Sequence, residues 1–195
     1  MSVNKLETLE VSGTPEDIGF AIGQADADSI QKQVLQLAEF RETERTWQDS
    51  SYLQELLTAA RYFFPEYVLE LEGMARGAQV EYETLLVWNC RGDLPLSDDA
   101  IPESAKHSPE GCTTLLYPAA KSSVAVIAHN EDGPPELDGH CCWLSVRQEN
   151  GSKFSTFHYP GMLPGHMFSV NSHGLVQTIN NFRVDDLQSG IPHWC

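Results

Sequence analysis

The sequence predicts an α+β protein in which a helical part precedes an antiparallel sheet. Apolar side chains recur at helical spacing between residues 14 and 88. Short runs of strand-forming residues, separated by turn signals, follow from residue 113 onward. Between the two parts, residues 93–110 are rich in proline, serine and acid and lack a periodic pattern, which is typical of an exposed loop or linker.

The first elements are a strand and a helix. Residues 2–13 predict a short strand, and the next residues form a good helix start. Thr14 is a suitable N-cap, and Pro15 fits the first helical position because its missing N–H has no partner there in any case. Gly19 and Gly23 lie four residues apart on one face of this helix, which predicts that another element packs closely against it.

Three further helices are expected before the linker. A polar stretch, 41–51, is predicted to separate the first helix from the second. Pro65 stops or kinks the second helix, because proline cannot donate the helical hydrogen bond. The third helix is predicted to end near Gly77, which suits the position just beyond a helix end, and the fourth covers residues 82–88.

Strands dominate the remainder of the chain. Asn150-Gly151 is the strongest short signal for a hairpin turn, and residues 118–122 have the length of a hairpin connection. The predicted strand pairs are 113–117 with 124–129, 142–148 with 153–158, and 167–170 with 175–179.

Composition restricts the classes of partner. Twelve Lys and Arg residues against 28 Asp and Glu residues give a formal charge of −16. Nucleic acids and anionic membrane surfaces both require clustered basic residues, so we expect neither as a partner. No signal peptide and no apolar run near ~18 residues is visible. Because the five cysteines lack metal-type spacing and no secretory signal precedes them, we expect reduced thiols and a cytoplasmic location.

Cys112 lies where the helical part gives way to strands, directly after Gly111. If the first hairpin turns near residues 120–121, antiparallel pairing places Cys112 across from about His129. The second strand of that hairpin would then carry the polar segment His129-Asn130-Glu131-Asp132 back to the thiol.

These residues permit self-cleavage. The Cys112 thiol can attack the carbonyl carbon of Gly111, forming a thioester that water resolves. The new α-amino group of Cys112, with a reference pKa near ~8, can then act as general base for its own thiol. Asp132 is a candidate for holding that amino group, and Asn130 for donating to a developing oxyanion.

The order of several motifs resembles a known family. They are Gly13-Thr14-Pro15-Glu16-Asp17-Ile18-Gly19-Phe20, Glu72-Gly73-Met74-Ala75-Arg76-Gly77-Ala78, Asn89-Cys90-Arg91-Gly92-Asp93, Gly111-Cys112-Thr113-Thr114, His129-Asn130-Glu131-Asp132, and Asn171 with Gly174-Leu175 and Asn180-Asn181. Together they are similar to the acyl-coenzyme A/isopenicillin-N acyltransferase family of cysteine N-terminal-nucleophile hydrolases, which are peptidase C45-like. The resemblance covers nearly the whole chain.

The resemblance implies an αββα sandwich and cleavage between Gly111 and Cys112, with two fragments that stay associated. It implies that Cys112 is the nucleophile and that Asp132 supports its amino group. Members transfer or hydrolyse acyl groups on amides, so the expected partner is a small acyl amide or an acyl-CoA or other thioester. The His129-Asn130-Glu131-Asp132 form is closer to the members that cleave β-alanyl conjugates of amines.

The resemblance also implies a division of the chain. Residues 1–111 would be a helical, pro-segment-like part ending in a linker at 93–111, and residues 112–195 the start of the nucleophile-bearing part. The family continues well beyond the equivalent of residue 195 and there supplies an oxyanion asparagine and strands of a second sheet. We therefore expect part of the sandwich in this chain.

Three functions stay open on the sequence. The first is a self-processing amidohydrolase or acyltransferase, and the second an unprocessed or inactive relative that binds a ligand or partner. The third is a conventional thiol hydrolase with His129 as base; His129 is also a candidate for contacting substrate. No cofactor or metal is expected, because adjacent residues of His140-Cys141-Cys142 would face opposite sides of a strand.

Overall fold

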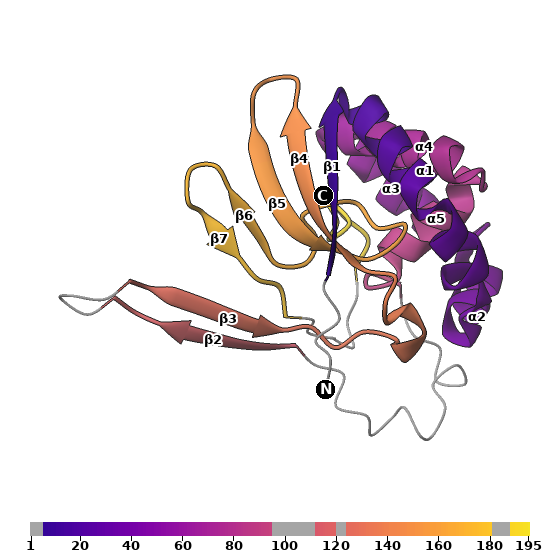
Figure 1. Ribbon diagram of the computed structural model, residues 1–195. Helices are drawn as coiled ribbons and strands as arrows, with labels where there is room; N and C mark the ends of the chain where they lie inside the picture. The colour runs from indigo at the N-terminus through magenta and orange to yellow at the C-terminus, as the bar shows by residue number, and fades with distance from the viewer. Residues whose placement is uncertain (1–5, 95–111, 120–123, 181–187) are drawn as a thin grey trace.

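A computed structural model describes residues 6–94, 112–119, 124–180 and 188–195. Gly111, nearly all of the predicted linker and Asn181 lie outside these ranges. The described residues form a layer of helices on one side of a five-stranded sheet, and a separate two-stranded hairpin projects away from both (Figure 1). This confirms the predicted α+β class. Within the described residues, no helix combines the length and apolarity needed to cross a membrane.

Apart from α2, which the sequence did not predict, the elements follow one another in the predicted order. They are β1 (Glu7–Gly13), α1 (Pro15–Lys32), α2 (Ala38–Trp47), α3 (Ser51–Phe63), α4 (Pro65–Ala78), α5 (Tyr82–Cys90), β2 (Thr113–Tyr117), β3 (Val126–Asn130), β4 (Cys142–Gln148), β5 (Lys153–His158), β6 (Ser169–Asn171) and β7 (Val176–Gln177), with short 3-10 turns at Val34–Gln36 and Pro135–Leu137. The predicted bounds of β2, β4 and β5 agree with the structure.

The prediction for the polar stretch 41–51 was wrong, because α2 runs through most of it. Phe40 anchors this helix in the core with only 2% of its surface exposed. The hydroxyls of Thr43 and Thr46 donate to backbone carbonyls one turn earlier and so remain compatible with the helix. One buried side chain per two turns is too sparse a pattern to reveal a helix by periodicity.

The predicted close contact on Gly19 and Gly23 is confirmed, and α4 is the element that makes it. A Cβ atom on Gly19 would lie 1.8 Å from the carbonyl oxygen of Glu70, and one on Gly23 would lie 2.0 Å from that of Met74. Gly73 of α4 faces α1 with equally little space. The two backbones therefore touch, which any larger residue at these positions would prevent.

The predicted end of the third helix near Gly77 is confirmed, since α4 ends at Ala78, but Gly77 lies inside the helix and not just beyond its end. Gly77 belongs to the same contact as Gly19, Gly23 and Gly73. A Cβ atom on Gly77 would lie 2.2 Å from the carbonyl oxygen of Phe20. The helix continues to Ala78, and Gln79 caps it in the left-handed conformation at φ 57°. Gly77 therefore serves the packing against α1, and the sequence alone does not distinguish this role from that of a glycine just beyond a helix end.

The main sheet has the order β1-β4-β5-β6-β7. Strands β4 to β7 form the predicted antiparallel meander, whereas β1 joins β4 in parallel, with Leu9 opposite Leu144. The antiparallel description therefore holds for four strands, and the sheet as a whole is mixed. The hairpin β2–β3 is a sheet of its own, separate from that meander.

Buried hydrogen bonds tie the helices to the loop after β5. Asp26 of α1 accepts from His158 Nε2 at 2.8 Å and from the backbone N–H of Gly161 at 3.1 Å. Asn89 of α5 donates to the carbonyl of Gly161 and accepts from the backbone N–H of Leu163 at 2.8 Å. Because buried polar groups are costly unless they are paired, these bonds fix the loop against the helices.

Candidate active site

The register of the β2–β3 hairpin decides which side chains meet Cys112. Thr113 pairs with Asn130 and Thr114 with His129, two residues along from the predicted pairing of Cys112 with His129. Since alternate residues of a strand share a face, a shift of two residues keeps His129 on the side of Cys112. Asn130 lies on the opposite face of the hairpin.

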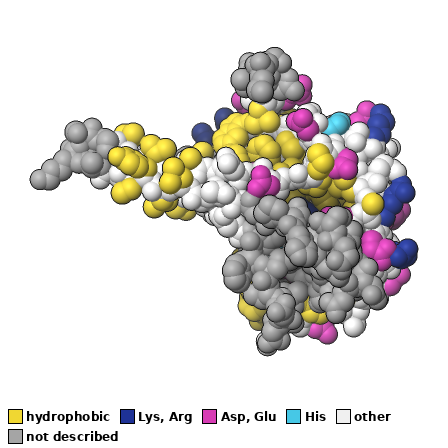
Figure 2. Space-filling view, turned by 90° about the horizontal axis from the view of Figure 1, so that it is seen from below, with side chains coloured by type: hydrophobic (Ala, Val, Ile, Leu, Met, Phe, Trp, Pro, Cys, Tyr) yellow, Lys and Arg dark blue, Asp and Glu magenta, His cyan; other side chains and the backbone are white. Residues whose placement is uncertain are grey.

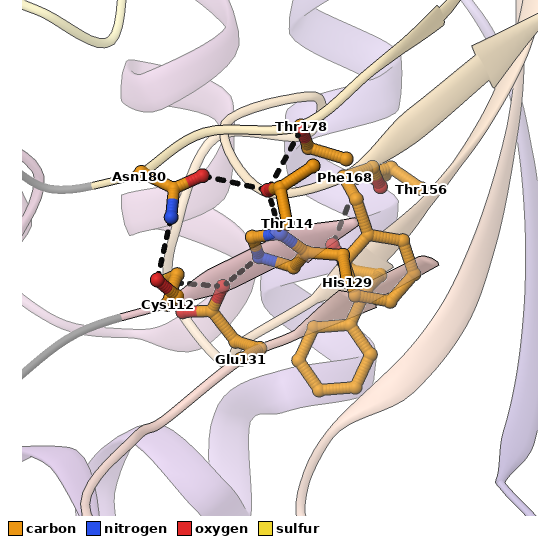
Figure 3. Close-up of polar contacts among 9 residues, drawn as sticks. Cys112, Thr114, His129, Glu131, Thr156, Phe168, Thr178 and Asn180 are labelled. Atoms are coloured by element: carbon orange, nitrogen blue, oxygen red, sulfur yellow. Dashed lines mark hydrogen bonds and ion pairs between the residues drawn. The ribbon is translucent and has the colours of Figure 1, made fainter. Parts of the chain in front are cut away.

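Glu131 brings the thiol and the imidazole together. The Sγ of Cys112 donates to Oε2 of Glu131 at 3.4 Å, and Nε2 of His129 lies 3.1 Å from the same oxygen (Figure 3). The side chains of His129 and Glu131 are 3% and 12% exposed, whereas Cys112 is half-buried. The imidazole and the carboxylate are thus largely shielded from water.

Thr114 connects this cluster to Thr178 and Asn180, which follow β7. Its Oγ1 lies 2.8 Å from Nδ1 of His129, 2.7 Å from Oδ1 of Asn180 and 3.2 Å from Oγ1 of Thr178. The side-chain amide of Asn180 in turn donates to the carbonyl oxygen of Cys112. The contacts therefore close into a ring that runs from Cys112 through Glu131, His129, Thr114 and Asn180 back to Cys112 (Figure 3).

The ring fixes the direction of its hydrogen bonds. The amide nitrogen of Asn180 is used on Cys112, so its Oδ1 faces Thr114 and can only accept. The single hydroxyl hydrogen of Thr114 goes to that oxygen, so Thr114 must accept from Nδ1–H of His129. Nε2 of His129 then donates to Glu131 when the imidazole is protonated. The thiol donates to the same carboxylate oxygen, which makes Glu131 the common acceptor.

The structure places some of the residues predicted from the sequence in this ring and others outside it. Cys112 and His129 belong to the ring, together with Glu131, which the sequence presented only as one acid of a polar motif. Asn130 and Asp132 are exposed and are not members of the ring. Gly111 lies outside the described residues. Thr114, Thr178 and Asn180 were missed as site residues; for Thr114, its alternation with Cys112 on one strand is the signal that identifies it.

Aromatic side chains form a wall beside the imidazole. The ring of Phe168 lies 5.5 Å from that of His129, centroid to centroid, and 5.3 Å from that of Phe157, on which it stacks. Trp143 of β4 lies 5.9 Å from Phe168. Because Leu144 next to Trp143 is fully buried, the pleat turns Trp143 away from that side of the sheet. This aromatic wall (Trp143, Phe157 and Phe168) is half-buried, so it can contact an apolar group.

The other four cysteines are poor candidates for a nucleophile. Burial raises the pKa of the Cys90, Cys141 and Cys195 thiols to about 12 and that of Cys142 to about 11. Thiols of such high pKa are scarcely ionised near neutral pH, and the thiolate is the reactive form. Cys112 differs from them in its carboxylate neighbour and its place at the start of β2.

Cys112, His129 and Glu131 also form the kind of group that can hold a metal ion, since one ligand atom from each lies within 4.8 Å of the others. The side chains of His140-Cys141-Cys142, considered above as a possible metal site, do not form such a group among the described residues. His140 uses Nδ1 on the hydroxyl of Ser29 at 3.0 Å, and the thiol of Cys141 faces a backbone carbonyl at 3.6 Å.

Comparison with known proteins gives two matches. A sequence model of the acyl-coenzyme A:6-aminopenicillanic acid acyl-transferase family matches residues 119–195. The chain is also 30% identical, over 199 aligned positions, to the β-alanyl-dopamine/carcinine hydrolase of Drosophila melanogaster. That alignment covers 93% of this chain and 50% of the relative, so the chain spans about half the length of the curated relative it matches.

Proposed function

Because this chain belongs to the acyl-coenzyme A:6-aminopenicillanic acid acyltransferase family, we propose that it carries the nucleophile of a self-processing amide hydrolase or acyltransferase, with Cys112 as that nucleophile. The observation that carries the proposal is the contact between the Cys112 thiol and Glu131 at the first residues of the hairpin. The high pKa values of the other thiols support the same choice.

The processing step needs a base and a nucleophile, and the ring supplies both. Glu131 accepts the thiol hydrogen, and Sγ attacks the carbonyl carbon of Gly111. The peptide C–N bond breaks, the nitrogen takes up a proton as the α-amino group of Cys112, and a thioester remains. Water then adds to the thioester, which releases a carboxylate on Gly111 and restores the thiol. Asn180 holds the carbonyl of Cys112 throughout, which keeps the backbone beside the scissile bond in place.

Turnover would repeat this chemistry on a small acyl amide. The α-amino group of Cys112 takes the thiol proton, Sγ attacks the acyl carbon, and the amine leaves with that proton. Water or an acceptor amine then resolves the acyl thioester. Asp132 is proposed to hold the α-amino group, since it follows Glu131 directly after β3 and is accessible. The oxyanion donor expected from Asn130 is not part of this proposal, because the hairpin register places Asn130 on the face opposite Cys112.

The aromatic wall suggests the class of substrate. The relative is named for hydrolysis of β-alanyl-dopamine and carcinine. We propose that this chain acts on N-acyl amines, with the ring of the amine packed against Phe168 and Trp143 beside the nucleophile. Offset or edge contacts between such rings contribute about 0.5–1.5 kcal/mol beyond burial, enough to favour an aromatic amine over an aliphatic one. An acyl-CoA or other thioester is the corresponding acyl donor for a transferase.

We also propose that the helices and main sheet are one half of an αββα sandwich. The hairpin supports this, because its large apolar side chains are mostly exposed among the described residues: Leu115, Leu116 and Tyr117 are 65%, 67% and 60% exposed. Figure 2 shows apolar side chains along this projecting hairpin. In the proposal, residues 1–111 and 112–195 remain associated after processing, and a second sheet covers the exposed apolar surface.

Intact mass spectrometry of the purified chain tests the processing step. Two fragments separated between Gly111 and Cys112 are expected from the wild type, and one unbroken chain from Cys112→Ala. The matched control is Cys142→Ser, which changes a thiol outside the ring and should be processed normally. A Cys112→Ala chain that is still cut at this bond would point to an outside protease. An unbroken wild type whose Cys112 also resists an electrophile would refute the proposal.

The second candidate is a conventional thiol hydrolase with His129 as base, favoured by the 3.1 Å contact between His129 and Glu131. The two candidate functions predict different effects of substitutions at Glu131 and His129. With Glu131 as the base for processing, Glu131→Gln slows the appearance of fragments more than His129→Ala does. If His129→Ala abolishes alkylation of Cys112 and no variant is cut, the conventional hydrolase is the better description.

A further inference from the structure

Cys112, His129 and Glu131 present three ligand atoms of the types that zinc prefers, a thiol sulfur, an imidazole nitrogen and a carboxylate oxygen. We propose that these side chains bind a zinc-type divalent cation and that the bound ion masks the thiol. Binding requires only the three side chains, whereas inhibition of processing or turnover rests on the proposed function.

The spacing of the ligand atoms suits a tetrahedral ion. Zinc bond lengths of about 2.0–2.3 Å place neighbouring ligand atoms of a tetrahedral site ~3.3–3.6 Å apart. Sγ of Cys112 and Oε2 of Glu131 are 3.4 Å apart, Nε2 of His129 is 3.1 Å from that oxygen, and all ligand atoms of the group lie within 4.8 Å. Small side-chain rotations therefore separate the ligands enough to admit the ion, without a change in the hairpin.

A second layer of contacts already orients the imidazole. A metal-binding histidine normally donates its other ring N–H to an acceptor, which fixes the tautomer that leaves the ligand nitrogen free. Nδ1 of His129 donates to Thr114 at 2.8 Å, and Asn180 and Thr178 hold that hydroxyl. Nε2 therefore points to the side of the thiol, as ligation requires.

Burial and charge favour the ion as well. The side chains of His129 and Glu131 are 3% and 12% exposed, so water screens their attraction for a cation weakly. Cys112 is only half-buried, and the formal charge of −16 concentrates cations around the chain. Ligation displaces the thiol proton to solvent, and the imidazole proton as well if it is present, so binding releases protons.

Occupation would stop attack by the thiol. The sulfur lone pair that bonds the ion is the one that would attack a carbonyl carbon, so the ligated thiol is not a nucleophile. The α-amino group freed by processing lies on the same residue and can complete the fourth position as a five-membered chelate. Release by a chelator restores the thiol, which makes the block reversible.

Calorimetric titration with Zn²⁺, and absorption titration with Co²⁺, test the proposal on the intact chain. One ion per chain and a sulfur-to-cobalt charge-transfer band are expected for the wild type. Cys112→Ser, His129→Ala and Glu131→Ala should each abolish saturable binding, and Thr114→Val should weaken it ~10–100-fold through the imidazole. Intact mass establishes whether each sample is cut, so that loss of processing is not mistaken for loss of metal.

His166→Ala is the matched control. Nε2 of His166 lies 3.2 Å from Nε2 of His193, so this pair outside the hairpin is a competing pair of zinc-binding side chains. Zinc binding that survives Cys112→Ser and disappears in His166→Ala would overturn the proposal, as would the absence of saturable binding to the wild type. Binding that follows Cys112 and blocks its alkylation until a chelator is added supports it, whether or not the chain is an active hydrolase.

Discussion

Glu70 of α4 gives a quantitative prediction about stability. Its side chain lies against the core with 4% of the residue exposed, and its Oε1 has no hydrogen-bond partner among the described residues. Burial raises the pKa of this carboxyl from 4.5 to about 8, because the ionised form would lose its hydration. Glu70 is therefore protonated in the folded protein at neutral pH.

The sign of the pH dependence follows from that shift. In the unfolded chain Glu70 loses its proton near pH 4.5, whereas the folded protein keeps it until pH approaches about 8. Between these values the folded state binds more protons, so the free energy of unfolding falls as pH rises. Each pH unit of the window costs up to ~1.4 kcal/mol, so the burial of Glu70 costs on the order of 5 kcal/mol at its upper end.

Urea unfolding of wild type and Glu70→Gln across this window is the assay. The wild type should lose stability steeply with rising pH, whereas Glu70→Gln should lose much less, so that the two curves converge at the acidic end and separate at the alkaline end. Glu72→Gln on the same helix is the control, since Glu72 is 40% exposed at its side chain and should leave the slope unchanged. Parallel curves for wild type and Glu70→Gln would refute the reasoning.

Two further predictions concern packing and the ring. Gly19→Ala forces a Cβ atom to within 1.8 Å of the Glu70 carbonyl oxygen and should cost at least ~1–3 kcal/mol of unfolding free energy, whereas Gly190→Ala, with open space around it, should be silent in the same denaturation assay. Equal losses for the two would contradict the α1–α4 contact. Thr114→Val should slow alkylation of Cys112 about threefold to tenfold, because a lost hydrogen bond is worth ~0.5–1.5 kcal/mol. Thr113→Val on the opposite face should leave that rate unchanged, and an equal effect of both would show that the ring does not orient the thiol.

The sequence predicted the structure best where particular residues favour one local backbone conformation, as at turns and helix caps. Asn150-Gly151 fixed the β4–β5 hairpin and both of its strands, with Gly151 at φ 90° as such a turn requires. The Thr14 cap likewise marked the start of α1, where Asp17 completes the capping box. In both places a few neighbouring residues determine the backbone, so no tertiary information was needed.

The hairpin register and the pairing of distant strands could not be predicted from local sequence in the same way. The connection 118–122 lacks a residue pair that specifies one turn type, so its length left the hairpin register uncertain by two residues. That uncertainty decides whether Cys112 faces His129 or, by extension of the observed register, Glu131. The parallel pairing of β1 with β4 joins residues about 135 positions apart, as Glu7 and Cys142 do, and no local pattern encodes such a partner.

The contacts between the helices and the sheet have a consequence for a chain divided after residue 111. Strand β1 and the side chains of Asp26 and Asn89 belong to the first piece, while β4 and the loop at Gly161 belong to the second. The hydrophobic core of one domain would thereby become the interface of a heterodimer, held by a shared sheet and buried hydrogen bonds. Separation of such pieces would break the pairing of β1 with β4 and expose the buried polar groups of Asp26 and Asn89.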